Sequence, residues 1–153
     1  MRRTVYLDYA GTTPIDPRVL RVVLTHFKKS WGNPSSAHIA GRQAKKVIDN
    51  ARKDVARVLN VRPDEIIFTG SGTESANLAV MGAARAYKKL GKHIITSKIE
   101  HHAVLRACQY LEKNEKFEVS YLDVGKDGIV NPESVRRALR SDTILVSIMY
   151  ANN

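Results

Sequence analysis

The sequence predicts an α/β fold in which helices flank a mostly parallel sheet. From residue 65 onward, short apolar runs alternate with segments of helical periodicity. The runs lack the apolar–polar alternation of a half-exposed strand, as is typical of strands buried on both faces of a parallel sheet. The connections between them are short, which favours right-handed strand–helix–strand units.

The N-terminal part of the chain is predicted to be helical. Asp16-Pro17 indicates a helix start, because Asp caps a helix well and Pro fits its first turn. A turn cluster follows at residues 32–36, and apolar residues at helical spacing predict a long helix over 37–59. We expect residues 1–36 to form an N-terminal arm and residues 37–153 to form the first part of a larger domain.

The remaining elements follow in alternation. For the last helix, Asn131 is the expected N-cap and Pro132 the first residue. Ligands of parallel sheets bind beyond the carboxyl ends of the strands. Gly70 to Ser75, Glu100-His101-His102 and Ala151-Asn152-Asn153 would then share one rim. The expected strands are 65–69, 93–97, 117–122 and 143–149, and the expected helices are about 74–89, 101–113 and 132–140.

The turn Gly70-Ser71-Gly72-Thr73 is the strongest local signal of a ligand. Backbone N–H groups at a helix start, the helix dipole and two hydroxyls suit a phosphate monoester. No Lys follows Gly72, which argues against a nucleoside triphosphate loop, and Ser75 replaces the third Gly of a dinucleotide fingerprint. An ordinary strand-to-helix connection, capped by Thr73 or Ser71, remains the alternative.

Composition excludes several classes of protein. The formal charge of +10 is spread along the chain, which favours solvated helix faces over a nucleic-acid site, because no aromatic residues interleave with the bases. An acidic protein partner stays open. No run is long enough to span a membrane and no signal peptide is expected, so we expect a cytoplasmic protein.

The single cysteine, Cys108, lies among apolar residues of an expected helix and is interpreted as a buried, inert thiol. His101 and His102 are adjacent, so they would point in different directions, and no second ligand pair has the spacing of a zinc site. We therefore expect no metal site.

Several ordered motifs resemble the N-terminal portion of the cysteine desulfurases, which are pyridoxal 5'-phosphate (PLP) enzymes of the class V aminotransferase group. The resemblance extends through nearly all of the chain. The segments that carry it are residues 5–14, 32–36, 65–77, 93–101 and 142–153. One departure is Gly70-Ser71-Gly72, where the family usually has Ser-Gly-Gly or Ser-Gly-Ala.

The resemblance implies a fold-type-I PLP enzyme, of which residues 37–153 are the first part of the PLP-binding large domain. It implies that Gly72 and Thr73 bind the cofactor phosphate. It also implies that His101 is catalytic, covering the pyridine ring and taking part in proton transfer, and that Asn153 lies near the cofactor. The implied substrate is L-cysteine, which yields L-alanine and an enzyme persulfide for iron–sulfur cluster or thiolated tRNA synthesis.

In this family the Lys that holds the cofactor covalently and the persulfide Cys lie beyond the matching positions. We therefore expect an incomplete form that is inactive alone. The expected partners are a second copy or a complementary C-terminal fragment, and an acidic sulfur acceptor or iron–sulfur scaffold protein. The alternative is a non-catalytic scaffold or regulatory subunit that keeps the half-fold.

Overall fold

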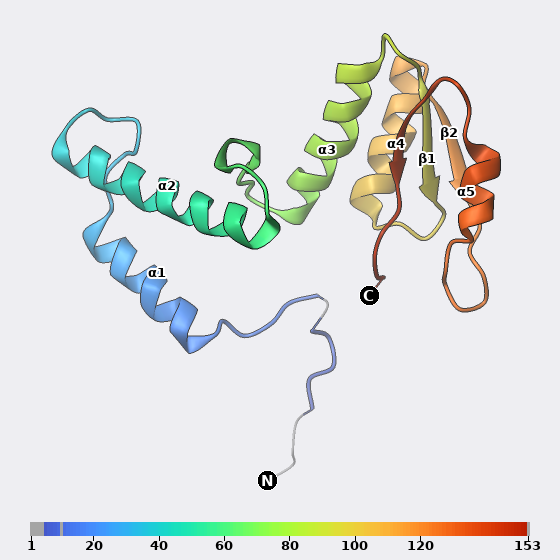
Figure 1. The fold of residues 1–153 in the computed structure, drawn as a ribbon. Coiled ribbons are helices and arrows are strands. Elements are labelled where there is room, and N and C mark those ends of the chain that lie inside the picture. The colour runs from blue at the N-terminus through green and yellow to red at the C-terminus, as the bar shows by residue number, and fades with distance from the viewer. Residues whose placement is uncertain (1–4, 10, 153) are drawn as a thin grey trace. The chain divides into compact units, whose positions relative to one another are not determined.

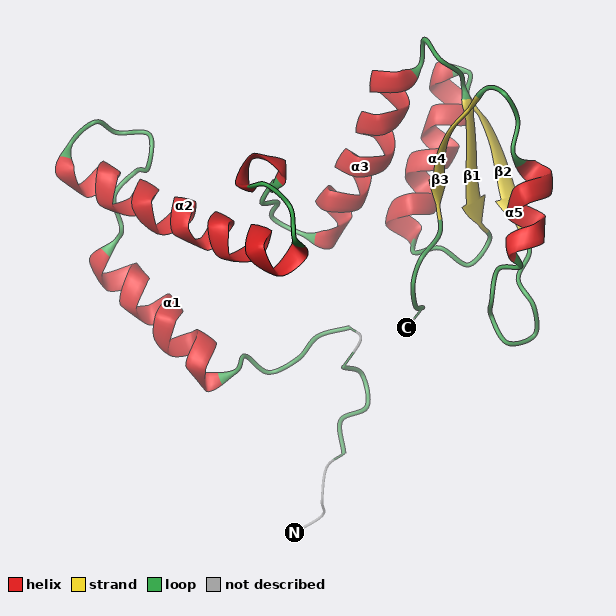
Figure 2. Cartoon of the chain, in the orientation of Figure 1, coloured by secondary structure: helices red, strands yellow, loops and turns green. Residues whose placement is uncertain are grey.

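A computed structural model describes residues 5–9 and 11–152. The chain divides into two compact units between Phe68 and Thr69. Figure 2 distinguishes the helices, strands and loops of both units. The N-terminal arm over 1–36 and the large-domain portion over 37–153 stay predictions, because compact units within this chain do not test those boundaries.

The first unit is helical, with α1 (Pro17–Lys29), α2 (Ile39–Leu59) and a short 3-10 helix, η1 (Pro63–Glu65). Asp16 caps α1 as predicted, because its carboxylate accepts a hydrogen bond from the Arg18 N–H at 2.7 Å. His38 caps α2, and Asn60 ends it in the left-handed conformation with φ of 54°. Both predicted helices are therefore confirmed.

Gly41 allows the turn before α2 to lie against that helix. It is buried, and a Cβ at this position would contact the carbonyl oxygens of Ser36 and Asn33, the latter at 2.7 Å. Carbonyl oxygens belong to the backbone and cannot rotate away as a side chain can. A glycine is thus required here by close approach of the chain.

The second unit is a parallel α/β unit. Its three strands pair in the order β2-β1-β3, with β1 in the centre and parallel to both neighbours. This confirms the predicted fold class. Asn131 caps α5 as predicted, accepting from the Glu133 N–H at 2.9 Å. The elements of the unit are α3 (Gly72–Tyr87), β1 (His93–Ser97), α4 (His102–Glu115), β2 (Glu118–Leu122), α5 (Pro132–Ala138) and β3 (Thr143–Ser147).

The core of this unit lies between the central strand and the helices α3 and α4. Every residue of β1 is buried, as expected for a central strand without alternation. The side chain of Ile94 packs into a cluster with residues of both helices. This packing holds the helices α3 and α4 against the sheet. The buried members are Val80, Ala84, Ile94, Ala107, Cys108, Leu111 and Phe117.

The prediction of a strand over 65–69 is wrong. Glu65 ends η1, Ile66 is extended, and residues 66–69 belong to no strand. The reason is the lack of a neighbour: the sheet of the described residues contains β1, β2 and β3 alone, so no ladder of hydrogen bonds forms on this segment. Its apolar side chains remain uncovered, with Ile67 69% and Phe68 49% exposed.

The strand β3 lies at an edge of the sheet and is only half-buried, in contrast to the prediction of burial on both faces. Val146 is 43% exposed, and Ile148, just beyond the strand, is 37% exposed. The difference from β1 follows from position, because a central strand has neighbours on both sides and an edge strand has one.

None of the helices in the described part of the chain is long and apolar enough to cross a membrane.

Candidate functional site

The start of α3 is an ordered turn with unused donors. Ser71 caps the helix, since its hydroxyl accepts from the Glu74 N–H at 3.1 Å, and the Glu74 carboxylate accepts from the Gly70 N–H at 2.7 Å. These bonds decide between the two candidate caps in favour of Ser71. Within the described residues, no hydrogen bond is recorded for the N–H groups of Gly72 and Thr73 or for the Thr73 hydroxyl. Such donors at a helix start suit an anion.

Open space adjoins this helix start. A Cβ built on Gly72 would meet nothing within 4 Å, whereas one built on Gly41 would meet backbone oxygens. Packing among the described residues therefore gives no reason for a glycine at position 72. Room beside free backbone donors is what close approach of a phosphate group requires. The residues present thus fit the phosphate of PLP.

His101 caps the start of α4. Its Nδ1 atom accepts a hydrogen bond from the Ala103 N–H at 3.1 Å. That bond needs the lone pair of Nδ1, so the neutral imidazole carries its proton on Nε2. The ring is exposed and has no other recorded protein partner among the described residues. His101 therefore presents Nε2 as the atom that can donate or exchange a proton.

The rings of the two adjacent histidines lie apart. The ring centroids of His101 and His102 lie 6.2 Å apart and the ring planes are tilted by 58°. Across residues 5–9 and 11–152, no group of three or more His, Cys, Asp or Glu side chains is placed to hold a metal ion.

Glu100 is a candidate that the sequence placed on the rim without a role, and the structure shows which groups it binds. It is only 6% exposed, and its Oε1 atom accepts from both the Ser97 hydroxyl and the Met149 N–H, each at 2.8 Å. The Asn152 side chain adds a second link by donating to the Ile99 carbonyl at 2.8 Å. In the sequence, the only signal was an acidic residue between a buried strand and a helix start.

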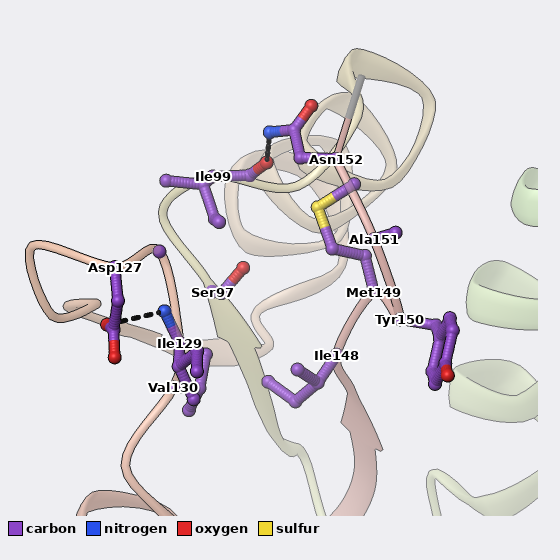
Figure 3. Close-up of a pocket in the computed structure, with 11 residues that line it drawn as sticks. Ser97, Ile99, Asp127, Ile129, Val130, Ile148, Met149, Tyr150, Ala151 and Asn152 are labelled. Carbon is purple, nitrogen blue, oxygen red and sulfur yellow. Dashed lines mark hydrogen bonds between the residues drawn. The ribbon is translucent and has the colours of Figure 1, made fainter. Parts of the chain in front are cut away.

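A cavity of about 420 Å³ lies at the carboxyl ends of the strands. Figure 3 shows the Ile148 side chain on the side of Ile129 and Val130, whereas Tyr150 points the opposite way. Gly72, Thr73 and His101 do not line this cavity. Its lining residues are Ser97, Ile99, residues 127–130 and residues 148–152.

Gly72, Thr73 and His101 nevertheless belong to one end of the unit. In Figure 1 the first turn of α3, the first turn of α4 and the carboxyl ends of β1 and β3 lie at the same end. This agrees with the rim expected for a parallel sheet. Asn153, the fourth predicted residue, lies outside the described residues. The roles of Gly72, Thr73, His101 and Asn153 stay predictions.

Cys108 is unsuited to nucleophilic chemistry. Its side chain is fully buried in the α3–α4 core, and this burial raises the pKa of the thiol to about 11. A thiol with this pKa is almost entirely protonated near neutral pH, whereas the nucleophile is the thiolate. The prediction that Cys108 is buried in the core is confirmed, and its burial supports the interpretation as an inert thiol.

Comparison with known proteins gives a consistent result. Residues 5–153 match the family model described as aminotransferase class-V. A cysteine desulfurase IscS of Dictyoglomus turgidum is 52% identical over 153 residues, which are all of this chain and 39% of that protein. The chain thus spans about two fifths of the length of this relative.

Solved structures agree with this relationship. A NifS-like protein superposes with a TM-score of 0.88 at 42% identity, covering 93% of this chain and 39% of that one. The structure of SspA in complex with cysteine gives a TM-score of 0.87 at 39% identity, covering 95% of this chain and 42% of that one. The fold described above is therefore the N-terminal part of the fold of these proteins.

Proposed function

Since the chain belongs to the aminotransferase class-V family, we propose that it is the phosphate- and ring-binding part of a PLP-dependent cysteine desulfurase. The observation that carries the proposal is the start of α3, where open space adjoins Gly72 and the N–H groups of Gly72 and Thr73 have no hydrogen-bond partner within the described residues. We propose that these N–H groups and the Thr73 hydroxyl hold the cofactor phosphate. The dipole of α3 adds favourable charge at the same point.

His101 is proposed to act on the ring and on protons. Its Nδ1 is held by the Ala103 N–H, which fixes the ring plane and leaves Nε2 to hold or move a proton. A flat imidazole also suits contact with the face of a pyridine ring. When bound, PLP supplies an electron sink at the substrate carbon, which no amino-acid side chain offers.

The proposed substrate is L-cysteine. Its sulfur passes to an enzyme thiol, so that the C–S bond of cysteine breaks, a persulfide S–S bond forms, and L-alanine leaves. The complex of the relative SspA with cysteine supports this substrate class. Cys108 is the only cysteine of these 153 residues and is buried, so we propose that the accepting thiol belongs to other residues of the complete enzyme.

The proposed partners are the chains that complete the site and the protein that accepts the sulfur. We propose that the site is completed by a complementary C-terminal portion and by a second copy in a homodimer. The charge of +10 supports an acidic protein as the sulfur acceptor, including an iron–sulfur scaffold protein. The IscS relative supports a role in iron–sulfur assembly. The alternative proposal is a non-catalytic scaffold or regulatory subunit that keeps the half-fold.

The phosphate site can be tested without the reactive aldehyde of PLP, which would modify surface lysines. Pyridoxine 5'-phosphate keeps the ring and the phosphate, and pyridoxine lacks the phosphate. We expect the first compound, and not the second, to shift the NMR signals of the Gly72 and Thr73 amides. Gly72→Ala should weaken binding about tenfold or more, because a methyl group occupies the space that the phosphate needs.

Gly82→Ala is the matched control for this experiment. Gly82 lies in the same helix and its Cβ would also meet nothing within 4 Å, so this variant should bind as the wild type does. Equal shifts with both compounds, or equal loss in both variants, would refute the phosphate site. The chain alone, supplied with PLP and L-cysteine, should release no sulfide, and sulfide release by the purified chain would refute the need for a complement.

A further inference from the structure

The Glu100 carboxylate joins two segments that are far apart in the sequence. One hydrogen bond runs from the Ser97 hydroxyl at the end of β1, and the other from the Met149 N–H, which is 49 residues away from Glu100. Both bonds are 2.8 Å long and both end on Oε1. This single oxygen therefore fixes the β1–α4 turn to the segment that follows β3.

The burial of this carboxylate needs an explanation, because a charge taken out of water is costly unless it is well hydrogen-bonded. Ion pairing does not supply one. Among the described residues, none of the ion pairs includes Glu100, and the nearby Lys98 pairs instead with Asp123 at 2.7 Å. The partners of the buried carboxylate are two neutral donors, the Ser97 hydroxyl and the Met149 N–H. The bridge between the two segments therefore explains its burial.

The two joined segments are those that the proposed function uses. Glu100 immediately precedes His101, whose backbone and ring begin α4. Met149 begins the stretch that leads through Asn152 to the chain's last residue. Two further bonds tie the same segments, from the Thr96 hydroxyl to the Ser147 carbonyl at 2.9 Å and from Asn152 to Ile99 at 2.8 Å.

We infer that Glu100 is a positioning residue that holds the His101 turn and residues 149–152 in one fixed arrangement. Its role in the reaction rests on the proposed function, whereas the bridge itself does not. The positioning depends on the acceptor oxygen and not on the negative charge, because both partners are neutral donors. Glutamine at this position would keep an oxygen acceptor of the same reach.

Amide hydrogen exchange of the 153-residue chain tests the inference without any cofactor. In Glu100→Ala, we expect exchange of the Met149 amide to rise about tenfold, since its hydrogen bond to the Glu100 oxygen is lost. The NMR signals of the His101 ring should shift in the same variant. Glu100→Gln should restore both towards wild type. Glu133→Ala, on the exposed face of α5, is the control and should change neither.

Two results would overturn the bridge: wild-type exchange at Met149 in Glu100→Ala, or the same increase in Glu100→Gln as in Glu100→Ala. If Glu100→Ala fails to fold, Ser97→Ala decides the matter. It removes one arm of the bridge and should raise Met149 exchange, so an unchanged rate in that variant would also overturn the inference. These exchange rates are measured without cofactor, so a failure of the proposed phosphate site would not change them.

Discussion

The imidazole of His93 connects all three strands at the amino end of the sheet. Its Nδ1 lies 2.7 Å from the Thr143 hydroxyl of β3, and its Nε2 lies 2.9 Å from the Ser120 hydroxyl of β2. The side chain is 1% exposed. Burial, and secondarily the nearby Arg140 cation, lowers the pKa of His93, while Asp142 and Glu118 act in the opposite direction.

This lowered pKa makes stability depend on pH. Because the unfolded chain binds a proton on His93 more readily than the folded chain, stability falls as pH drops below about 6.5, the ordinary value for histidine. Above that pH, both states carry the neutral ring and the effect vanishes. We expect the free energy of unfolding to decrease between pH 7 and pH 5, with a slope of at most about 1.4 kcal/mol per pH unit from this residue.

Urea unfolding of the second unit at several pH values measures this effect, and His93→Gln supplies the comparison. The variant keeps a donor and an acceptor but does not titrate, so its pH slope should be shallower than that of the wild type. Parallel slopes would show that other groups cause the dependence. Arg140 forms ion pairs with Asp142 at 2.8 Å and with Glu118, and these are unchanged by the substitution.

At the scale of elements, two glycines within helices are expected to respond in opposite ways to alanine. Gly82 in α3 has no atom within 4 Å of an added Cβ, so Gly82→Ala should stabilise by about 0.5–1 kcal/mol through helix propensity. Gly41 in α2 faces the carbonyl oxygens of Ser36 and Asn33. Gly41→Ala should destabilise by about 1–3 kcal/mol, since backbone atoms must move.

Amide hydrogen exchange reports on α2 and α3 separately, which matters because the two units need not unfold together. Protection should rise in α3 for Gly82→Ala and fall in α2 for Gly41→Ala. A stabilising effect of Gly41→Ala would mean that the turn at residues 33–36 is not held against the helix in solution.

At the scale of the whole molecule, the open edge of the sheet predicts self-association. Across residues 5–9 and 11–152, β3 has a partner strand on one side only, and Val146 and Ile148 are substantially exposed there. Edge strands with exposed apolar side chains pair readily with other chains. The charge of +10 opposes association, so added salt should strengthen it by screening the repulsion.

Sedimentation equilibrium over a range of protein and salt concentrations measures this association. Val146→Lys places a charge on the exposed edge and should shift the chain towards monomer, whereas Asn114→Lys, on exposed α4 surface, should not. A wild-type chain that stays monomeric at high concentration and high salt would contradict the expectation.

Local pattern was sufficient to predict most of the elements and the helix caps at Asp16 and Asn131. Helical spacing, an Asx residue before Pro, and apolar runs without alternation each act over a few residues, so they can be recognised in sequence. The same locality made the turn at Gly72 recognisable as a candidate anion site, which stays a prediction. The strand expected at 65–69 failed because a strand also needs a neighbour, and no local pattern contains one.

The sequence by itself determined the α/β class, the family and the positions of the Gly72, Thr73 and His101 candidates, since these depend on short-range chemistry and ordered motifs. Only the tertiary structure decided which cap begins α3, which strand is central, and that Glu100 bridges to Met149. Those facts depend on partners brought together by folding, such as an acceptor and a donor 49 residues apart. No periodic pattern in the sequence predicts such a hydrogen bond, because the fold of the sheet brings the donor and the acceptor together.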